Sequence, residues 1–292
     1  MGNEVSDIHQ KKGEGASKSM FTGKLGRTLY LWILLIALVP LTIVSFVSYR
    51  TAYDSLRQDA MNSLSAVTHL KMRYIDAFFS RILIDLALQS QLHSNVELLE
   101  DLENAFDKSG ESLRKFMKSF KWASMTREGG TDLRNFQMEY GIHDIFLIDL
   151  KGNILFTVMG EDDLGTNILS GKYANTLFGK ACRKALEIGQ AVYSDLETYG
   201  PSNNATTSFL AQVMVNEEGD KIGLMAFQIL VENINEVMRD PTGMGETGES
   251  YLVGRDLFMR SDSRFQEEST VLKRKVDTKG TRDWLEAEKE RH

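Results

Sequence analysis

The chain has 292 residues, with 34 Lys and Arg against 41 Asp and Glu, and a formal net charge of −7. This acidic balance, without a basic patch interleaved with aromatic residues, argues against a nucleic-acid-binding protein. Cys182 is the only cysteine, so no disulfide can form within the chain.

One apolar run, Leu29 to Tyr49, contains no charged residue. A bilayer core needs about 20 helical residues, so the run predicts a membrane-spanning helix over 29–49. Pro40 lies inside it, which membrane helices tolerate. The alternative is a cleaved signal peptide. We disfavour it because such an apolar region is only about 7–15 residues long and no clean A-x-A site follows.

Flanking charge predicts the orientation. The residues after the run, Arg50 and Arg57, are balanced by Asp54 and Asp59. The residues before it are basic: Lys11, Lys12, Lys18, Lys24 and Arg27. The positive-inside rule then puts residues 1–28, a predicted disordered tail, in the cytoplasm. It puts the roughly 240 residues after Tyr49 outside an inner (cytoplasmic) membrane, in the periplasm or extracellular space, as one large or two small domains.

Apolar residues recur at three- and four-residue spacing from Thr51 to about Leu102, without Gly or Pro, which predicts one long helix leaving the membrane. Its apolar positions fit one side of a domain core. They fit equally a seam between two copies of the chain, so a homodimer through this helix is the expected assembly. A second helix is predicted over about 109–126.

The pattern then changes to strands. Residues 144–150 and 154–158 flank Lys151-Gly152-Asn153, and residues 208–215 and 221–230 flank a second Gly-containing turn; both pairs predict hairpins. A strand over 191–196 and helices over 173–188 and 231–239 complete the block. Antiparallel strands with segregated helices indicate an α+β fold.

Residues 243–248 match the pattern G-x-G-x-x-G. A dinucleotide fingerprint follows a strand and opens a helix, whereas here a helix and Pro241 precede the match and a strand, 251–253, follows it. The match therefore predicts a turn. Another short strand is expected at 257–259, and the charged residues 265–292 are expected to be mostly helical and solvated.

In this order the pieces resemble the double Cache sensor domain of bacterial transmembrane receptors, over about residues 51–277. The most specific parts are Gly245–Gly254 (GETGESYLVG), Met259–Arg264 (MRSDSR) and Tyr193–Glu197 (YSDLE). The resemblance implies a long stalk helix plus a membrane-distal, PAS-like lobe over 50–240, and the start of a membrane-proximal lobe over 241–292. Receptors with this sensor include chemoreceptors, histidine kinases, nucleotide cyclases and regulated phosphatases.

Two departures from the family qualify the resemblance. The family pattern continues beyond the equivalent of His292, so the second lobe is expected to be truncated. The amino-acid-binding branch of the family has an Arg-x-Trp-Tyr cluster and a later strand Asp. Here the corresponding residues are 170–173, Ser-Gly-Lys-Tyr, and Gln228. The resemblance thus implies no carboxylate for an ammonium group and a ligand other than a standard α-amino acid.

No catalytic pattern is present: the His residues lack metal-ligand spacing, and no G-x-S-x-G or Walker motif occurs. We expect no enzyme, no metal site and no cofactor. Residues 161–163 form an acidic loop, with too few spaced oxygen ligands for calcium. Motif position gives five candidate ligand-binding residues: Tyr173, Tyr193, Asp195, Tyr199 and Gln228. Each tyrosine is alternatively a packed ring with its hydroxyl at the surface.

Two functions remain open from the sequence. The first is a small-molecule sensing module of a transmembrane signalling receptor, in which ligand binding is passed along the long helix. The second is a membrane-anchored binding or structural protein without a signalling output.

Overall fold

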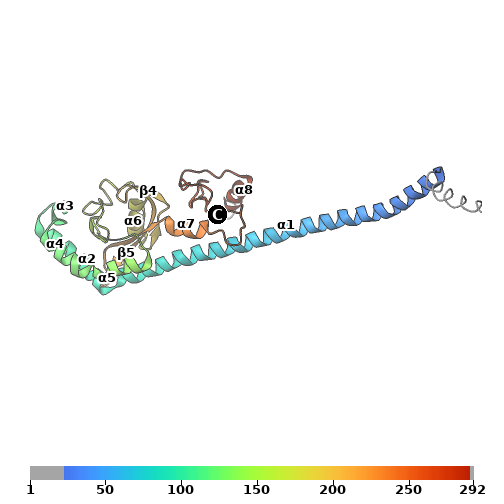
Figure 1. Ribbon diagram of the computed structural model, residues 1–292. Helices are drawn as coiled ribbons and strands as arrows, with labels where there is room; N and C mark the ends of the chain where they lie inside the picture. The colour runs from blue at the N-terminus through green and yellow to red at the C-terminus, as the bar shows by residue number, and fades with distance from the viewer. Residues whose placement is uncertain (1–22, 290–292) are drawn as a thin grey trace, which may run out of the picture. The chain divides into compact units, whose positions relative to one another are not determined.

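The computed structural model describes residues 23–289 (Figure 1). By contacts the chain divides into two compact units, Met1–Ser65 and Ala66–His292. Most of the predicted tail, residues 1–22, lies outside the described part. Helix α1, Lys24–Gln91, is one element of 68 residues.

In the first unit, α1 contains the predicted span. Its most apolar 18-residue window has a mean hydropathy of 2.5 and is 0% buried. Among residues 23–289, α1 is the one helix that is long and apolar enough to cross a membrane. Pro40 removes one backbone donor but does not end the helix, and the Thr42 hydroxyl donates to the Leu38 carbonyl one turn back (2.7 Å).

In the second unit, α1 packs one face on the domain. Its buried positions, Lys71, Ile75, Ile82 and Leu86, recur at the spacing of one helix face. The remaining residues of this stretch include several exposed apolar side chains.

The predicted long helix is divided at Leu92, where the backbone is extended (ψ 124°) and α2, His93–Ser109, begins. No Gly or Pro near Leu92 marks this break in the sequence. Instead the Asn95 amide of α2 donates to the Gln89 carbonyl at the end of α1 (2.8 Å), which also accepts from the Leu92 backbone amide (3.3 Å).

Three short helices follow. The predicted helix over 109–126 is two helices, α3 (Leu113–Phe116) and α4 (Phe120–Gly129). The Ser119 hydroxyl caps α4 by accepting from the Trp122 amide. Helix α5, Thr131–Tyr140, was not expected from the sequence.

Six strands form one antiparallel sheet in the order β2-β1-β6-β5-β3, with β4 also paired to β5. Both predicted hairpins are present, β1/β2 and β5/β6, and the α+β class is confirmed. The strands are β1 (Asp144–Asp149), β2 (Ile154–Thr157), β3 (Val192–Tyr193), β4 (Glu197–Tyr199), β5 (Ala205–Val215) and β6 (Lys221–Leu230).

The sheet is apolar on both faces. Along β1, Ile145 and Leu147 join a core with α1, α2, α4 and α5, whereas Phe146 and Ile148 join a core with helix α6, Leu177–Ile188. Two-residue alternation in a strand covered on both sides explains why all six positions of β1 are buried. A buried side chain that is not apolar therefore stands out in this strand.

After β6 the chain forms α7, Glu232–Arg239, then a segment of turns, then α8, Lys279–Lys289. The expected strands 251–253 and 257–259 are single bridges only, Val253 to Met259 and Phe258 to Lys275. Gly243 and Gly245 have positive φ (77° and 66°), as a turn requires.

Candidate functional site

The structure brings three of the five candidate residues to one face of the sheet, the face that α6 covers. Tyr173 and Tyr199 are buried with ring centroids 5.9 Å apart, and Gln228 of β6 is 0% exposed. The Tyr199 hydroxyl donates to Asp163 Oδ2 (2.8 Å). Asp163 lies in the loop between β2 and α6, so this bond fixes that loop against β4.

Gln228 lies directly across the strand pair from Asp144, the first residue of β1. The Gln228 amide nitrogen donates to Ser202 Oγ (2.8 Å), and Ser202 in turn donates to Glu161 Oε2. Because the single Ser202 proton is used for Glu161, Ser202 can only accept from Gln228. The orientation of the Gln228 amide follows, with Oε1 left over.

These five residues, Asp144, Glu161, Asp163, Ser202 and Gln228, are called the polar cluster below. Three oxygens in it have no hydrogen-bond partner among the residues that the structure describes: Asp144 Oδ2, Asp163 Oδ1 and Gln228 Oε1. Their side chains are each 0% exposed. A buried acceptor without a donor costs about 1–3 kcal/mol, so three together mark the polar cluster as the candidate site.

The two oxygens of Asp144 have different environments. Oδ1 accepts from the backbone amides of Ile145 (2.7 Å), Val158 (2.8 Å) and Met159 (3.0 Å) and so holds the open end of the β1/β2 hairpin. Oδ2 accepts from none of them. One oxygen therefore stabilises the fold, and the other is buried without a hydrogen-bond partner among the residues that the structure describes.

Burial changes the acidity of the cluster. It raises the pKa of Asp144 to about 7, with a smaller contribution from the charge of Asp163, against the three amides that stabilise the carboxylate. Burial also raises the pKa of Asp163 to about 6, although the hydrogen bond from Tyr199 opposes the rise. Both carboxyls thus change charge near neutral pH.

Helix α6 is fixed over this face by a carboxylate at its amino end. Glu197 of β4 accepts from the backbone amides of Leu177 (2.9 Å) and Phe178 (2.8 Å), where the helix has open N–H groups and partial positive charge. Phe178 then stacks on Phe209 of β5 (centroids 4.1 Å apart, planes at 12°).

The other two candidate residues do not join the polar cluster. Tyr193 is 37% exposed, its hydroxyl donates to the Phe79 carbonyl of α1 (2.6 Å), and its ring meets Phe79 edge-on. Asp195 binds Arg260 through both oxygens (2.8 Å each), which lowers the pKa of Asp195. Tyr193 and Asp195 thus lie at a junction with α1 and the C-terminal segment.

Two acidic residues of the cluster were missed, and one inference from the sequence is corrected. The absence of a carboxylate near Gln228 was expected, but Asp144 faces it and Asp163 lies close by. The available signal was the aspartate that opens β1, although a second aspartate, Asp149, closes the same strand. For Asp163 the signal was weaker, because an acidic loop is usually solvated.

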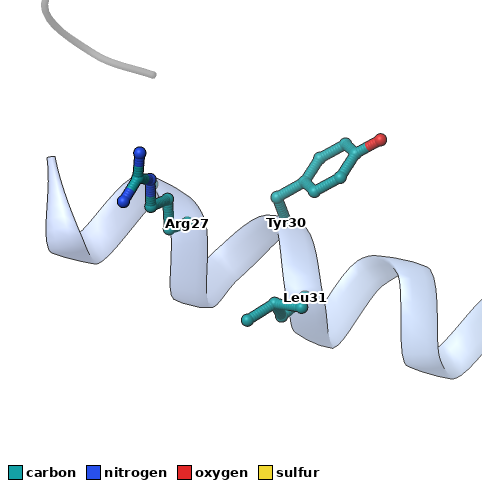
Figure 2. A pocket seen from close by; sticks show the side chains of 4 residues that line it. Arg27, Tyr30 and Leu31 are labelled. Carbon is teal, nitrogen blue, oxygen red and sulfur yellow. The ribbon is translucent and has the colours of Figure 1, made fainter. Parts of the chain in front are cut away.

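Among residues 23–289, no group of three or more His, Cys, Asp or Glu is placed to hold a metal ion. A separate shallow hollow lies on α1 beside Gly26, Arg27, Tyr30 and Leu31. Figure 2 shows the side chains of Arg27, Tyr30 and Leu31 on a single helix. This turn of α1 lies at the basic end of the predicted span. Arg and Tyr at such an end are typical of the membrane interface, so the hollow gives no site.

No family model and no curated protein matches the chain. Its structural neighbours are sensor domains of chemoreceptors and histidine kinases. The sensor domain of the V. cholerae histidine kinase DctB has a TM-score of 0.44 and 14% identity, and the match covers 64% of this chain and 60% of that one.

The ligand-binding domain of the Pseudomonas fluorescens chemoreceptor CtaA, in complex with L-isoleucine, has a TM-score of 0.46, 12% identity and coverage of 76% and 75%. The E. coli DcuS sensor domain has a TM-score of 0.38, 12% identity and coverage of 56% and 97%. These structures are what the chain is similar to in fold. With TM-scores below 0.5 they carry no weight in the function proposed next, which rests on the chain's own residues.

Proposed function

We propose that the chain is the extracytoplasmic sensing part of a membrane receptor and that it binds a small molecule at the polar cluster. The observation that carries the proposal is the set of three buried acceptor oxygens without donors. They lie on a sheet that packs against α1, and α1 also contains the apolar span. Binding and membrane attachment thus involve the same helix.

The span supports anchoring at 29–49 in a cytoplasmic membrane, with residues 1–28 inside and the rest outside. An exposed helix with no charge over this length is unstable in water but stable in lipid. The basic residues before it support the orientation. We assign residues 50–240 to the stalk and distal lobe, and the segment from 241 to the start of a second lobe.

The ligand has to supply hydrogen-bond donors, because the free atoms of the cluster are all acceptors. Two of them belong to carboxyl groups, and among residues 23–289 none of Asp144, Glu161 or Asp163 has a Lys or Arg within 4.0 Å. A cationic nitrogen group, an ammonium or a guanidinium, satisfies both the charge and the hydrogen bonds. Tyr173 and Tyr199 provide aromatic walls beside it.

Access requires a movement, since Asp144, Asp163 and Gln228 are all fully buried. The side chains of His143 and Glu161 remain partly exposed and mark the route inward. A ligand reaches the cluster only if the loop between β2 and α6, which holds Asp163, shifts. This shift is the conformational change that ligand binding can bias.

A contact between α7 and α1 offers a route for the signal. Strand β6, which carries Gln228, leads directly into α7. The Lys71 ammonium of α1 donates to the carbonyls of Met238 (3.1 Å) and Asp240 (2.7 Å) at the end of α7, and to Ser250 Oγ (2.9 Å). A displacement of β6 is thereby transmitted to the helix that leads to the membrane.

A homodimer through α1 is the assembly that we propose. Leu70, Tyr74, Ile84 and Leu88 are all more than half exposed, and their spacings of four, ten and four residues keep them on one side of the helix, as a coiled-coil seam requires. They lie on a different side of the helix from the buried positions.

We propose no catalytic role: burial raises the pKa of the single thiol, Cys182, away from a reactive state.

The test is a thermal-shift screen of the full chain in lipid nanodiscs with small amines, carboxylates, sugars and purines. Cationic amines should raise the unfolding midpoint because they supply donors to the cluster. Stabilisation by carboxylates alone would contradict the proposal.

A further inference from the structure

The polar cluster combines like charges without a fixed countercharge. Its carboxyls face His143 from the segment before β1, with Nε2 3.4 Å from Glu161 Oε1, and Tyr199 from β4. Lys172 is the nearest cation to Tyr173, and it contacts the Tyr173 hydroxyl (3.2 Å) and ring rather than a carboxyl. An acidic cluster alone proves no site, but the fully buried and unpartnered Gln228 Oε1 is an independent indication that this one receives a donor.

A proton can supply that donor in the ligand-free protein. Protonation of Asp144 turns an acceptor into a hydroxyl that donates, and Gln228, with its free acceptor, lies directly across the strand pair. The same change removes one of the mutually repelling charges. A proton and a cationic ligand thus each supply a hydrogen-bond donor and reduce the repulsion between the carboxylates.

We infer that the polar cluster exchanges protons for its ligand: in the ligand-free state Asp144 or Asp163 holds a proton, and a cationic group displaces it on binding. The inference rests on the ligand-binding function proposed above. The charges balance, because one positive charge enters as ammonium, one carboxyl O–H bond breaks, and the proton leaves to solvent. The net charge of the cluster stays the same.

The exchange makes the receptor sensitive to acid. Below the point at which the carboxyls ionise, protons compete with the ligand, and the affinity for a cation falls about tenfold for each pH unit and each proton displaced. Above that point the affinity is constant. The pKa values raised by burial, about 7 for Asp144 and about 6 for Asp163, place the transition near neutral pH.

The first measurement follows the proton without any ligand. Infrared difference spectra of the full chain in nanodiscs are recorded against pH, for the wild type and for Asp144→Asn and Asp163→Asn. Each Asn keeps the acceptor oxygen that serves the fold. A protonated carboxyl that titrates between about pH 6 and 7, and that the variants lose, is expected. Ionised carboxyls throughout this range would overturn the exchange while leaving ligand binding intact.

The second measurement uses methylammonium as the cation and tetramethylammonium as the control, which has the same charge but no N–H donor. The affinity for methylammonium should be about tenfold to a hundredfold higher at about pH 8 than at about pH 5.5, and Asp144→Asn should flatten this dependence. An affinity that is equal at both pH values would overturn the exchange alone. No binding at about pH 8, or equal binding of tetramethylammonium, would overturn the cationic ligand and the exchange together.

Discussion

At the scale of single residues, the buried carboxyl of Asp144 decides how the protein responds to pH. Its pKa is raised to about 7 in the folded protein, so the folded state binds a proton that the unfolded state releases at lower pH. This contribution to stability is present at acidic pH and is lost as the pH rises toward 7. The expected loss is on the order of 1.4 kcal/mol per pH unit.

The check is the free energy of unfolding of the ligand-free protein, measured with urea between about pH 5 and 8. Asp144→Asn should remove the decline between about pH 6 and 7, since the raised pKa of Asp163, about 6, acts mainly below this range, and it should be the more stable protein at the upper end. Asp132→Asn, at an exposed aspartate of α5, is the matched control and should keep the decline. A wild-type stability that rises with pH would contradict the assignment.

The sequence named three residues that the structure places on the face of the sheet with the polar cluster. Tyr173, Tyr199 and Gln228 were named from motif position, and the structure places them on one face. Asp144 was missed because its role depends on the register of β1 against β6, which sets it opposite Gln228. Tyr193 and Asp195 come from the segment Tyr193–Glu197, but their side chains contact Phe79 and Arg260, which come from distant parts of the chain.

At the scale of elements, local patterns were sufficient for the hairpins and insufficient for helix ends. The β1/β2 and β5/β6 hairpins follow from apolar runs around Gly-containing turns. The break at Leu92 depends on a side chain, Asn95, that bonds back to the preceding helix. The bridges at 253–259 lack the neighbouring strands that would extend them.

The connection between α1 and α7 gives a prediction at this scale. Lys71→Met keeps the apolar stem but leaves the carbonyls of Met238 and Asp240 without their charged donor. Loss of these buried bonds should destabilise the protein by about 1–3 kcal/mol in urea unfolding. Arg73→Met, at an exposed position of the same helix, should change little. Equal effects of the two substitutions would show that Lys71 does not hold α7.

At the scale of the whole molecule, the proposed dimer can be tested with single cysteines. The native Cys182 is fully buried, so an introduced thiol is the reactive one. Leu88→Cys lies on the exposed apolar side of α1, and Asp76→Cys lies about 120° around the helix. Mild oxidation in membranes should cross-link Leu88→Cys into dimers far faster than Asp76→Cys. Similar rates would argue against a seam at Leu70, Tyr74, Ile84 and Leu88.

The central claim is that a ligand binds at the polar cluster. Its most direct test is the dissociation constant of the best stabilising amine from the screen. Calorimetry on the full chain in nanodiscs would compare the wild type with Asp163→Asn and Asp195→Asn. Asp163→Asn still accepts from Tyr199 but removes the charge, and should weaken binding about 10- to 100-fold. Asp195→Asn, at the contact with Arg260, should leave the affinity unchanged. The reverse result, with Asp195 essential and Asp163 dispensable, would contradict the account and place the ligand at the Tyr193–Asp195 junction.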